Sequence, residues 1–218
     1  MRRKALLVAL ITAAAFALLF TLFTLLPKPK ESQLYYPIRV GDKREYLVGA
    51  DVISTHEVKS VEERDGDWFV SELISTSASE QTRSVSHRVS DTGLRSVGSI
   101  DSGTEFRAYP LLKLAPGGNP LPDGTTWEVD DAGATPGNYL KLIYTASAEE
   151  IEVPAGKYKA VKVEMRTRCE VNGKVLPETS RATTWYAKRV GVVKGVRTSP
   201  DGKEIGRIEL KSFTPCKG

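Results

Sequence analysis

The stretch AVKVEMRTRCEVNG, residues 160–173, decides the fold class, because its uncharged and charged side chains alternate one by one. The uncharged side chains that share one face are Val161, Val163, Met165, Thr167, Cys169 and Val171. The charged ones on the other face are Lys162, Glu164, Arg166, Arg168 and Glu170. Such alternation is typical of an antiparallel strand with one face on a core and the other in water. Asn172-Gly173 then predicts a tight hairpin, because a type I′ turn needs positive φ at both positions.

The same combination of strand and turn recurs along the chain. Three further turns are predicted at Asp65-Gly66, Asp91-Thr92-Gly93 and Pro200-Asp201-Gly202. The strands that they separate are predicted at Val52–Val61, Trp68–Ile74, Ser84–Ser90, Leu94–Ile100, Val192–Thr198 and Glu204–Phe213. Segments 110–124 and 130–138 are rich in proline or glycine and predict two long loops.

These strands predict an all-β domain over residues 35–218, since no window after Tyr35 shows a sustained helical period. A large antiparallel sheet must curl, split or close to bury its apolar face. We therefore expect a strongly curved sheet, either a half-barrel or an open barrel. A two-sheet β-sandwich is the alternative.

Residues 5–26 contain no charged side chain, and roughly 20 such residues span the ~30 Å hydrocarbon core of a membrane. The cations Arg2, Arg3 and Lys4 favour a cytoplasmic N-terminus. We therefore predict a cytoplasmic stub (1–4), a transmembrane signal anchor (5–26) and a linker (27–34). The protein would be a single-pass protein of a bacterial inner membrane, with its β domain in the periplasm or outside the cell. A signal peptide cleaved near Ala15-Phe16-Ala17 is the alternative.

The positive charge of the chain belongs to this N-terminal segment. Without Arg2, Arg3 and Lys4 the basic residues fall from 31 to 28 against 27 acidic ones, which leaves a net charge of +1. A surface that neutralises several phosphates of a nucleic acid usually carries a clear positive excess. We therefore expect no nucleic acid among the partners. The expected partners are the membrane, through the N-terminal helix, and a lipid or an envelope protein.

Cys169 and Cys216 are the two cysteines of the chain. Outside the cytoplasm such a pair is most simply a disulfide, so the sequence predicts a bridge between them. The alternative is a buried thiol in a strand and an inert thiol near the C-terminus.

Four short motifs follow one another in a recognisable order. They are Tyr36-Pro37, Val153-Pro154-Ala155-Gly156, Trp185-Tyr186-Ala187 and Val190-Gly191-Val192-Val193-Lys194. This order resembles a family of uncharacterised bacterial envelope proteins, each a signal-bearing β domain. The family is distantly similar to the half-barrel carriers that escort lipoproteins or lipids across the periplasm. The resemblance implies a periplasmic half-barrel and supplies no catalytic residue, and turn chemistry also accounts for the motifs.

The sequence contains no motif that indicates catalysis. It has no phosphate-binding loop of the G-x-x-x-x-G-K-[ST] type, no G-x-S-x-G nucleophile elbow and no H-E-x-x-H pair. His56-Glu57 lacks the second histidine four residues on. We therefore expect no enzyme activity, no catalytic residues, no metal site and no cofactor.

Two histidines are the best candidates for a binding site. His56 alternates in phase with Val52 and Val58, and His87 with Val85 and Val89, so both are predicted to face the concave side of the sheet. A few polar groups among apolar walls are the usual composition of a small-molecule pocket. Trp68 and Trp185 could line the same space. The alternative is that these four residues belong to an ordinary core, with each histidine hydrogen-bonded inside it.

These observations favour a non-enzymatic, membrane-tethered envelope protein. Its ligand would be apolar, a lipid or an acyl chain, bound on the concave face of the sheet. The alternative is an interaction or assembly factor of the cell envelope with a packed interior.

The predicted anchor can be tested by fractionation. We expect the protein to stay in the membrane fraction after carbonate washing, with an intact mass that includes Met1 or Arg2, because residues 5–26 are long and apolar enough to span the bilayer. Protease added outside the inner membrane should digest everything beyond Pro27. A soluble mature form that begins near residue 18 would contradict the anchor.

Overall fold

The computed structural model describes residues 31–97, 109–132, 138–178 and 180–217. The described chain is built from β-strands and one short 3₁₀ helix, η1 (Glu31–Gln33). The predicted stub (1–4) and anchor (5–26) lie outside the described residues. Within the described ranges, no helix is long and apolar enough to cross a membrane.

The described strands form two meanders, which are consecutive in the sequence. The first contains β1 (Lys43–Val48), β2 (Val52–Arg64), β3 (Asp67–Thr76), β4 (Ser79–Ser90), β5 (Gly93–Val97), β6 (Tyr109–Ala115) and β7 (Asn119–Pro120). The second contains β8 (Thr125–Ala132), β9 (Asn138–Val153), β10 (Gly156–Val171), β11 (Lys174–Val175), β12 (Arg181–Ala187), β13 (Gly191–Thr198) and β14 (Glu204–Thr214).

One long-range pairing joins the two meanders into a single sheet. β1 and β14 pair antiparallel, from Lys43 opposite Thr214 to Val48 opposite Ile208. The sheet order is then β7-β6-β5-β4-β3-β2-β1-β14-β13-β12-β10-β9-β8, with β11 attached to β10. The predicted all-β antiparallel fold is confirmed. The alternative of two separate sheets is wrong, because one hydrogen-bonded path runs through the strands.

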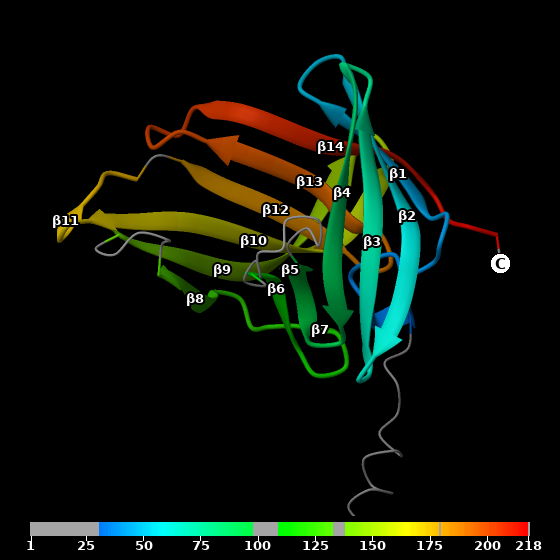
Figure 1. Ribbon diagram of the computed structural model, residues 1–218, viewed down its shortest axis with the longest axis horizontal. Helices are drawn as coiled ribbons and strands as arrows, with labels where there is room; N and C mark the ends of the chain where they lie inside the picture. Colours follow the sequence, from blue (N-terminus) through cyan, green and yellow to red (C-terminus); the bar gives the residue numbers. More distant parts are fainter. Residues whose placement is uncertain (1–30, 98–108, 133–137, 179, 218) are drawn as a thin grey trace, which may run out of the picture.

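The sheet is open, and it bends so that its distant parts share a core. Figure 1 shows that the two meanders cross at a steep angle. The strands β9, β10, β12, β13 and β14 run roughly horizontally in this view, and β2, β3 and β4 run roughly vertically. One cluster of buried side chains includes Leu112 of β6, Trp127 of β8 and Val161 of β10. The Nζ atom of Lys113 lies 5.9 Å from the ring centre of Trp127, so β6 and β8 approach each other. In the described part of the chain, β8 nevertheless pairs with β9 alone.

The strand that decided the fold class has the predicted alternation. Val161 and Val163 are buried in β10, whereas Glu164 is exposed. The predicted turn after this strand is also present, since Asn172 and Gly173 have φ values of 50° and 77°. These values are those that a type I′ hairpin requires.

Two predicted loops are corrected. Residues 109–115, expected to begin a loop, form β6, whose buried side chains are Pro110, Leu112 and Leu114. A proline is tolerated there because β6 pairs with β5 on one side at this point, while β7 reaches only Leu114 and Ala115 on the other. The second loop is shorter than predicted, because β8 continues to Ala132 and β9 begins at Asn138. Residues 133–137 lie outside the description.

The predicted disulfide is wrong, since both cysteines are free thiols. Cys169 stands opposite Leu140 near the end of β10, close to the hairpin that leads to β11. The backbone N–H of Cys216 donates to Asp42, beyond the end of β14. Figure 1 shows β11 and the C-terminus at opposite ends of the molecule. A disulfide needs Cα atoms within about 7 Å, which this placement of the strands does not allow.

The alternation in β10 can be tested with two adjacent substitutions. Val163→Asp should destabilise the domain by several kcal/mol, because it puts a carboxylate without a charged partner beside Ala146 and Thr184 in the core. Glu164→Lys, on the exposed face, should change the free energy of unfolding by no more than about 0.5 kcal/mol. Urea denaturation of both variants measures the difference. Equal losses would show that the two faces of the strand have been misassigned.

Candidate functional site

A buried ion pair lies at the centre of the concave face. Arg44 of β1 pairs with Glu72 of β3, and the two side chains are 2% and 1% exposed. Both charged side chains point to the buried face of their strands. Arg44 lies two residues before buried Tyr46, and Glu72 lies between buried Val70 and Ile74 on the same face. β2 lies between these two strands, so the pair spans three neighbouring strands of the first meander.

The guanidinium of Arg44 also holds two segments that are distant in the sequence. Its Nη2 donates to the Tyr36 hydroxyl at 3.3 Å, and its Nη1 donates to the Val190 carbonyl at 3.2 Å. Gly191, next to that carbonyl, has a φ of 87°, and a Cβ placed on it would lie 2.5 Å from Nη1. Glycine is therefore required there both by the turn between β12 and β13 and by the approach of Arg44.

Both predicted histidines lie beside this ion pair. Nδ1 of His56 is 3.7 Å from a Glu72 carboxylate oxygen, and its Nε2 is 3.2 Å from the Ser54 hydroxyl. The ring of His87 packs at 4.8 Å, centre to centre, on that of Tyr36. The two histidines come from different strands, β2 and β4. Both point to the concave side, as their alternation predicts, and both lie beside the ion pair.

A cavity of about 210 Å³ opens between these groups. The residues that line it come from both meanders and from the segment before β1: Tyr36, Arg44, Tyr46, His56, Glu72, Ile74, Arg83, Val85, His87, Leu94, Leu111, Tyr186, Val192 and Ile208. Arg83 is exposed, so the cavity reaches the surface at β4. Its wall thus combines apolar side chains with a small set of polar groups, an arrangement typical of ligand sites.

The protonation states in this cavity follow from burial and from neighbouring charges. Burial alone would raise the pKa of Glu72, but the nearby positive charge of Arg44 and hydrogen bonds outweigh it and lower the pKa to about 2. For His87, burial disfavours the charged ring and lowers the pKa to about 4. At neutral pH the site therefore holds an ionised Glu72 and an uncharged His87.

The two predicted tryptophans lie elsewhere. Trp68 packs on the edge of the core cluster, and Trp185 belongs to a second apolar cluster, with its Nε1 donating to Glu149 at 3.1 Å. Neither is among the residues that line the cavity. In β12 it is the next residue, Tyr186, that faces the cavity.

Sequence reasoning missed Arg44, Glu72 and Tyr36. Glu72 could have been found, because a carboxylate in phase with Val70 and Ile74 is a charge on the buried face of a strand. The alternation within β3 shows that Glu72 points inward, but it does not show that Arg44 is its partner.

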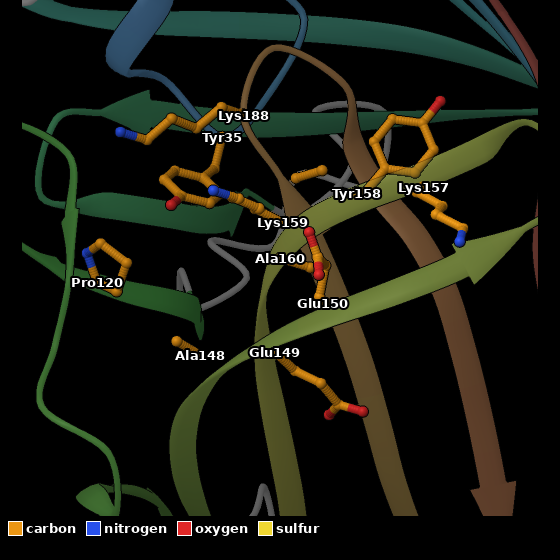
Figure 2. Close-up of a pocket in the computed structure, with 11 residues that line it drawn as sticks. Tyr35, Pro120, Ala148, Glu149, Glu150, Lys157, Tyr158, Lys159, Ala160 and Lys188 are labelled. Carbon is orange, nitrogen blue, oxygen red and sulfur yellow. The ribbon is translucent and has the colours of Figure 1, made fainter.

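A second hollow is larger, at about 810 Å³, and lies beside the turn end of the β9–β10 hairpin. Figure 2 shows the side chains of Tyr35 and Lys188 next to one another, with Glu149 directed away from them. Its charged residues, Glu149, Glu150, Lys157, Lys159 and Lys188, are exposed to solvent. The smaller cavity is the better candidate site, because its polar groups are buried and converge.

Among the described residues, no group of three or more His, Cys, Asp or Glu side chains could hold a metal ion.

The second meander carries a recognisable family pattern. Residues 145–210 match the model of the DUF3108-like family. This confirms the predicted resemblance to a family of uncharacterised β domains. The DUF3108-like segment runs from β9 into β14 and contains the β12–β13 turn that contacts Arg44. A search of curated proteins found no match.

Two solved structures share the fold. A protein from Parabacteroides distasonis, described as a lipoprotein, has a TM-score of 0.57 at 11% identity and covers 83% of this chain and 98% of its own. A protein from Bacteroides fragilis, described as exported and as having a YmcC-like fold, has a TM-score of 0.50 at 12% identity and covers 83% and 99%. At these identities the likeness establishes the fold alone.

The ion pair yields a stability prediction. Glu72→Gln should lower the free energy of unfolding by about 3–5 kcal/mol, because it leaves the Arg44 charge buried without a carboxylate. The double variant Arg44→Met, Glu72→Gln should lose less than the sum of the two single variants. Urea denaturation of the double-mutant cycle measures this coupling, and additive losses would show that the pair does not interact.

An exposed pair provides the control. Glu204→Gln breaks a surface pair with Arg207 and should change the free energy of unfolding far less than Glu72→Gln does, because water and salt screen exposed charges.

Acid should have the same effect on the wild type as the Glu72→Gln substitution. The folded pKa of Glu72, about 2, lies below its ordinary value of 4.5, so its contribution is complete above pH 4.5 and is lost as the pH falls towards 2.

Proposed function

We propose that this protein is a non-enzymatic, membrane-tethered envelope protein that binds an apolar ligand, a lipid or an acyl chain, in the cavity beside Arg44 and Glu72. One observation carries the proposal: the concave face is not filled, and it leaves a cavity of about 210 Å³ with a mainly apolar wall and a few buried polar groups.

The volume limits what the cavity can hold. Pockets for complete small molecules measure about 300–1,000 Å³, so this cavity suits one end of an acyl chain or a single small apolar group. A dry apolar cavity of about 150 Å³ is large enough for benzene. The rest of a longer ligand would leave the cavity at the exposed Arg83.

We also propose the cell envelope as its location and residues 5–26 as its single-pass anchor, with the N-terminus in the cytoplasm and the β domain outside it. The uncharged segment 5–26 supports this, and so do the two structural neighbours, which are described as an exported protein and a lipoprotein. Leu34 is fully buried, and its carbonyl accepts a hydrogen bond from the N–H of Arg189 at 2.7 Å. The packed domain therefore begins only a few residues after the anchor, so the tether would hold it close to the membrane.

A docking role is the second candidate, and it is favoured by β8, one side of which has no partner strand among the described residues. In the described chain this strand pairs only with β9. An open edge can accept a strand from another protein, which would make the chain an interaction or assembly factor of the envelope.

Filling the cavity tests the ligand proposal. Val85→Trp places a large ring in the cavity, whereas Ser84→Trp places the same ring on the exposed opposite face of β4. Lipid extraction and mass spectrometry of the purified full-length proteins should recover about one apolar ligand per chain from the wild type and from Ser84→Trp. The Val85→Trp variant should retain little.

The two candidate functions give different results in this experiment. Wild-type protein that carries no apolar ligand, or a Val85→Trp variant that retains it fully while folded, would reject the cavity as the binding site. The docking role would then be preferred, and circular dichroism of the variants verifies that they are folded.

A further inference from the structure

We propose that the ligand of this cavity carries an uncharged hydroxyl group, which forms a hydrogen bond with Nδ1 of His87. This inference rests on the proposed function and specifies the chemical class of the ligand: a neutral alcohol on an apolar body, rather than a fatty-acid carboxylate.

The observation behind it is a buried ring nitrogen without a partner. Nδ1 of His87 is buried and has no hydrogen-bond partner. In an uncharged imidazole ring one nitrogen carries the proton and the other carries a lone pair. Nδ1 therefore needs an acceptor in one tautomer and a donor in the other, and a hydroxyl group can supply either.

The other polar groups of the wall are largely occupied. Both nitrogens of His56 have partners, the Ser54 hydroxyl and the Glu72 carboxylate. The hydroxyl of Tyr46 donates to the Val192 carbonyl at 2.8 Å. Among the described residues that line the cavity, the other buried polar side-chain atom without a partner is Nε of Arg44, a donor. A hydroxyl can both donate and accept, so it suits this wall better than an amide N–H does.

The charges of the site argue against an anionic ligand. The charge of Arg44 is already neutralised by Glu72, so a second carboxylate would be buried beside the first without a cation of its own. A hydroxyl avoids this cost, since burying a polar group is expensive only when its hydrogen bond is not made.

Phenol and toluene are the probes that fit this test. They have nearly the same size and shape, and the cavity of about 210 Å³ exceeds the roughly 150 Å³ that suffices for benzene. Only phenol carries a hydroxyl. Calorimetric titration of the full-length protein in one detergent gives both dissociation constants, and partitioning into micelles is then common to all variants.

The test compares two histidine variants with the wild type. His87→Leu should weaken phenol binding about fivefold relative to toluene, which is the effect of losing one neutral hydrogen bond. His56→Leu is the matched control. This substitution removes the His56 ring from the same cavity wall, and both nitrogens of that ring already have partners. The ratio of the phenol and toluene dissociation constants should therefore stay at the wild-type value.

The outcomes separate this inference from the proposed function. If toluene and phenol bind in the same ratio to wild type and His87→Leu, the hydroxyl inference is wrong and the apolar site stands. If neither probe binds to the wild type, the proposed function fails with it. Nitrogen-15 NMR of wild-type histidines is independent of whether the variants fold. Phenol, and not toluene, should shift the Nδ1 signal of His87, and an unmoved signal would overturn the inference.

Discussion

The arrangement of the concave face depends on one buried ion pair, that of Arg44 and Glu72. Removing two charges from water costs several kcal/mol per ion, and their attraction repays this only when other hydrogen bonds complete the site. The Tyr36 hydroxyl and the Val190 carbonyl supply such bonds to Arg44. The pair therefore requires the segment before β1 and the β12–β13 turn to lie where they do, and Gly191 is what allows that turn to approach.

This pair also explains the mixed character of the cavity. Charged groups that must keep their hydrogen-bond geometry cannot be repacked as freely as Leu or Val, so the space beside them is shaped by polar contacts and walled by apolar side chains. The result is one fixed polar region at the centre and an apolar surround. The proposed ligand, with an apolar body and one neutral polar group, would match that division, and the unpartnered Nδ1 of His87 is the atom that would distinguish it from a purely apolar one.

The site is assembled from both halves of the sheet. The matched family segment, 145–210, contributes the turn at Val190 and the lining residues Tyr186, Val192 and Ile208. The ion pair and both histidines come from the first meander, which lies outside that segment. Neighbours that share the fold at 11% and 12% identity therefore say little about this cavity, because function resides in side chains that a fold does not specify.

The sequence by itself determined most of the strands, most of their inward faces and the tight turns, because alternation and positive φ are local properties. It placed His56 and His87 on the concave side for the same reason. It did not predict β6, whose proline favoured a loop. Only the tertiary structure decided that β1 pairs with β14, that Glu72 meets Arg44, that Tyr186 rather than Trp185 reaches the cavity, and that Cys169 and Cys216 are far apart. These outcomes depend on which distant segments the bent sheet brings together. A strand's pattern fixes the side to which a residue points, but the residue that it meets there is set by the curvature and by the long-range pairing of the whole sheet.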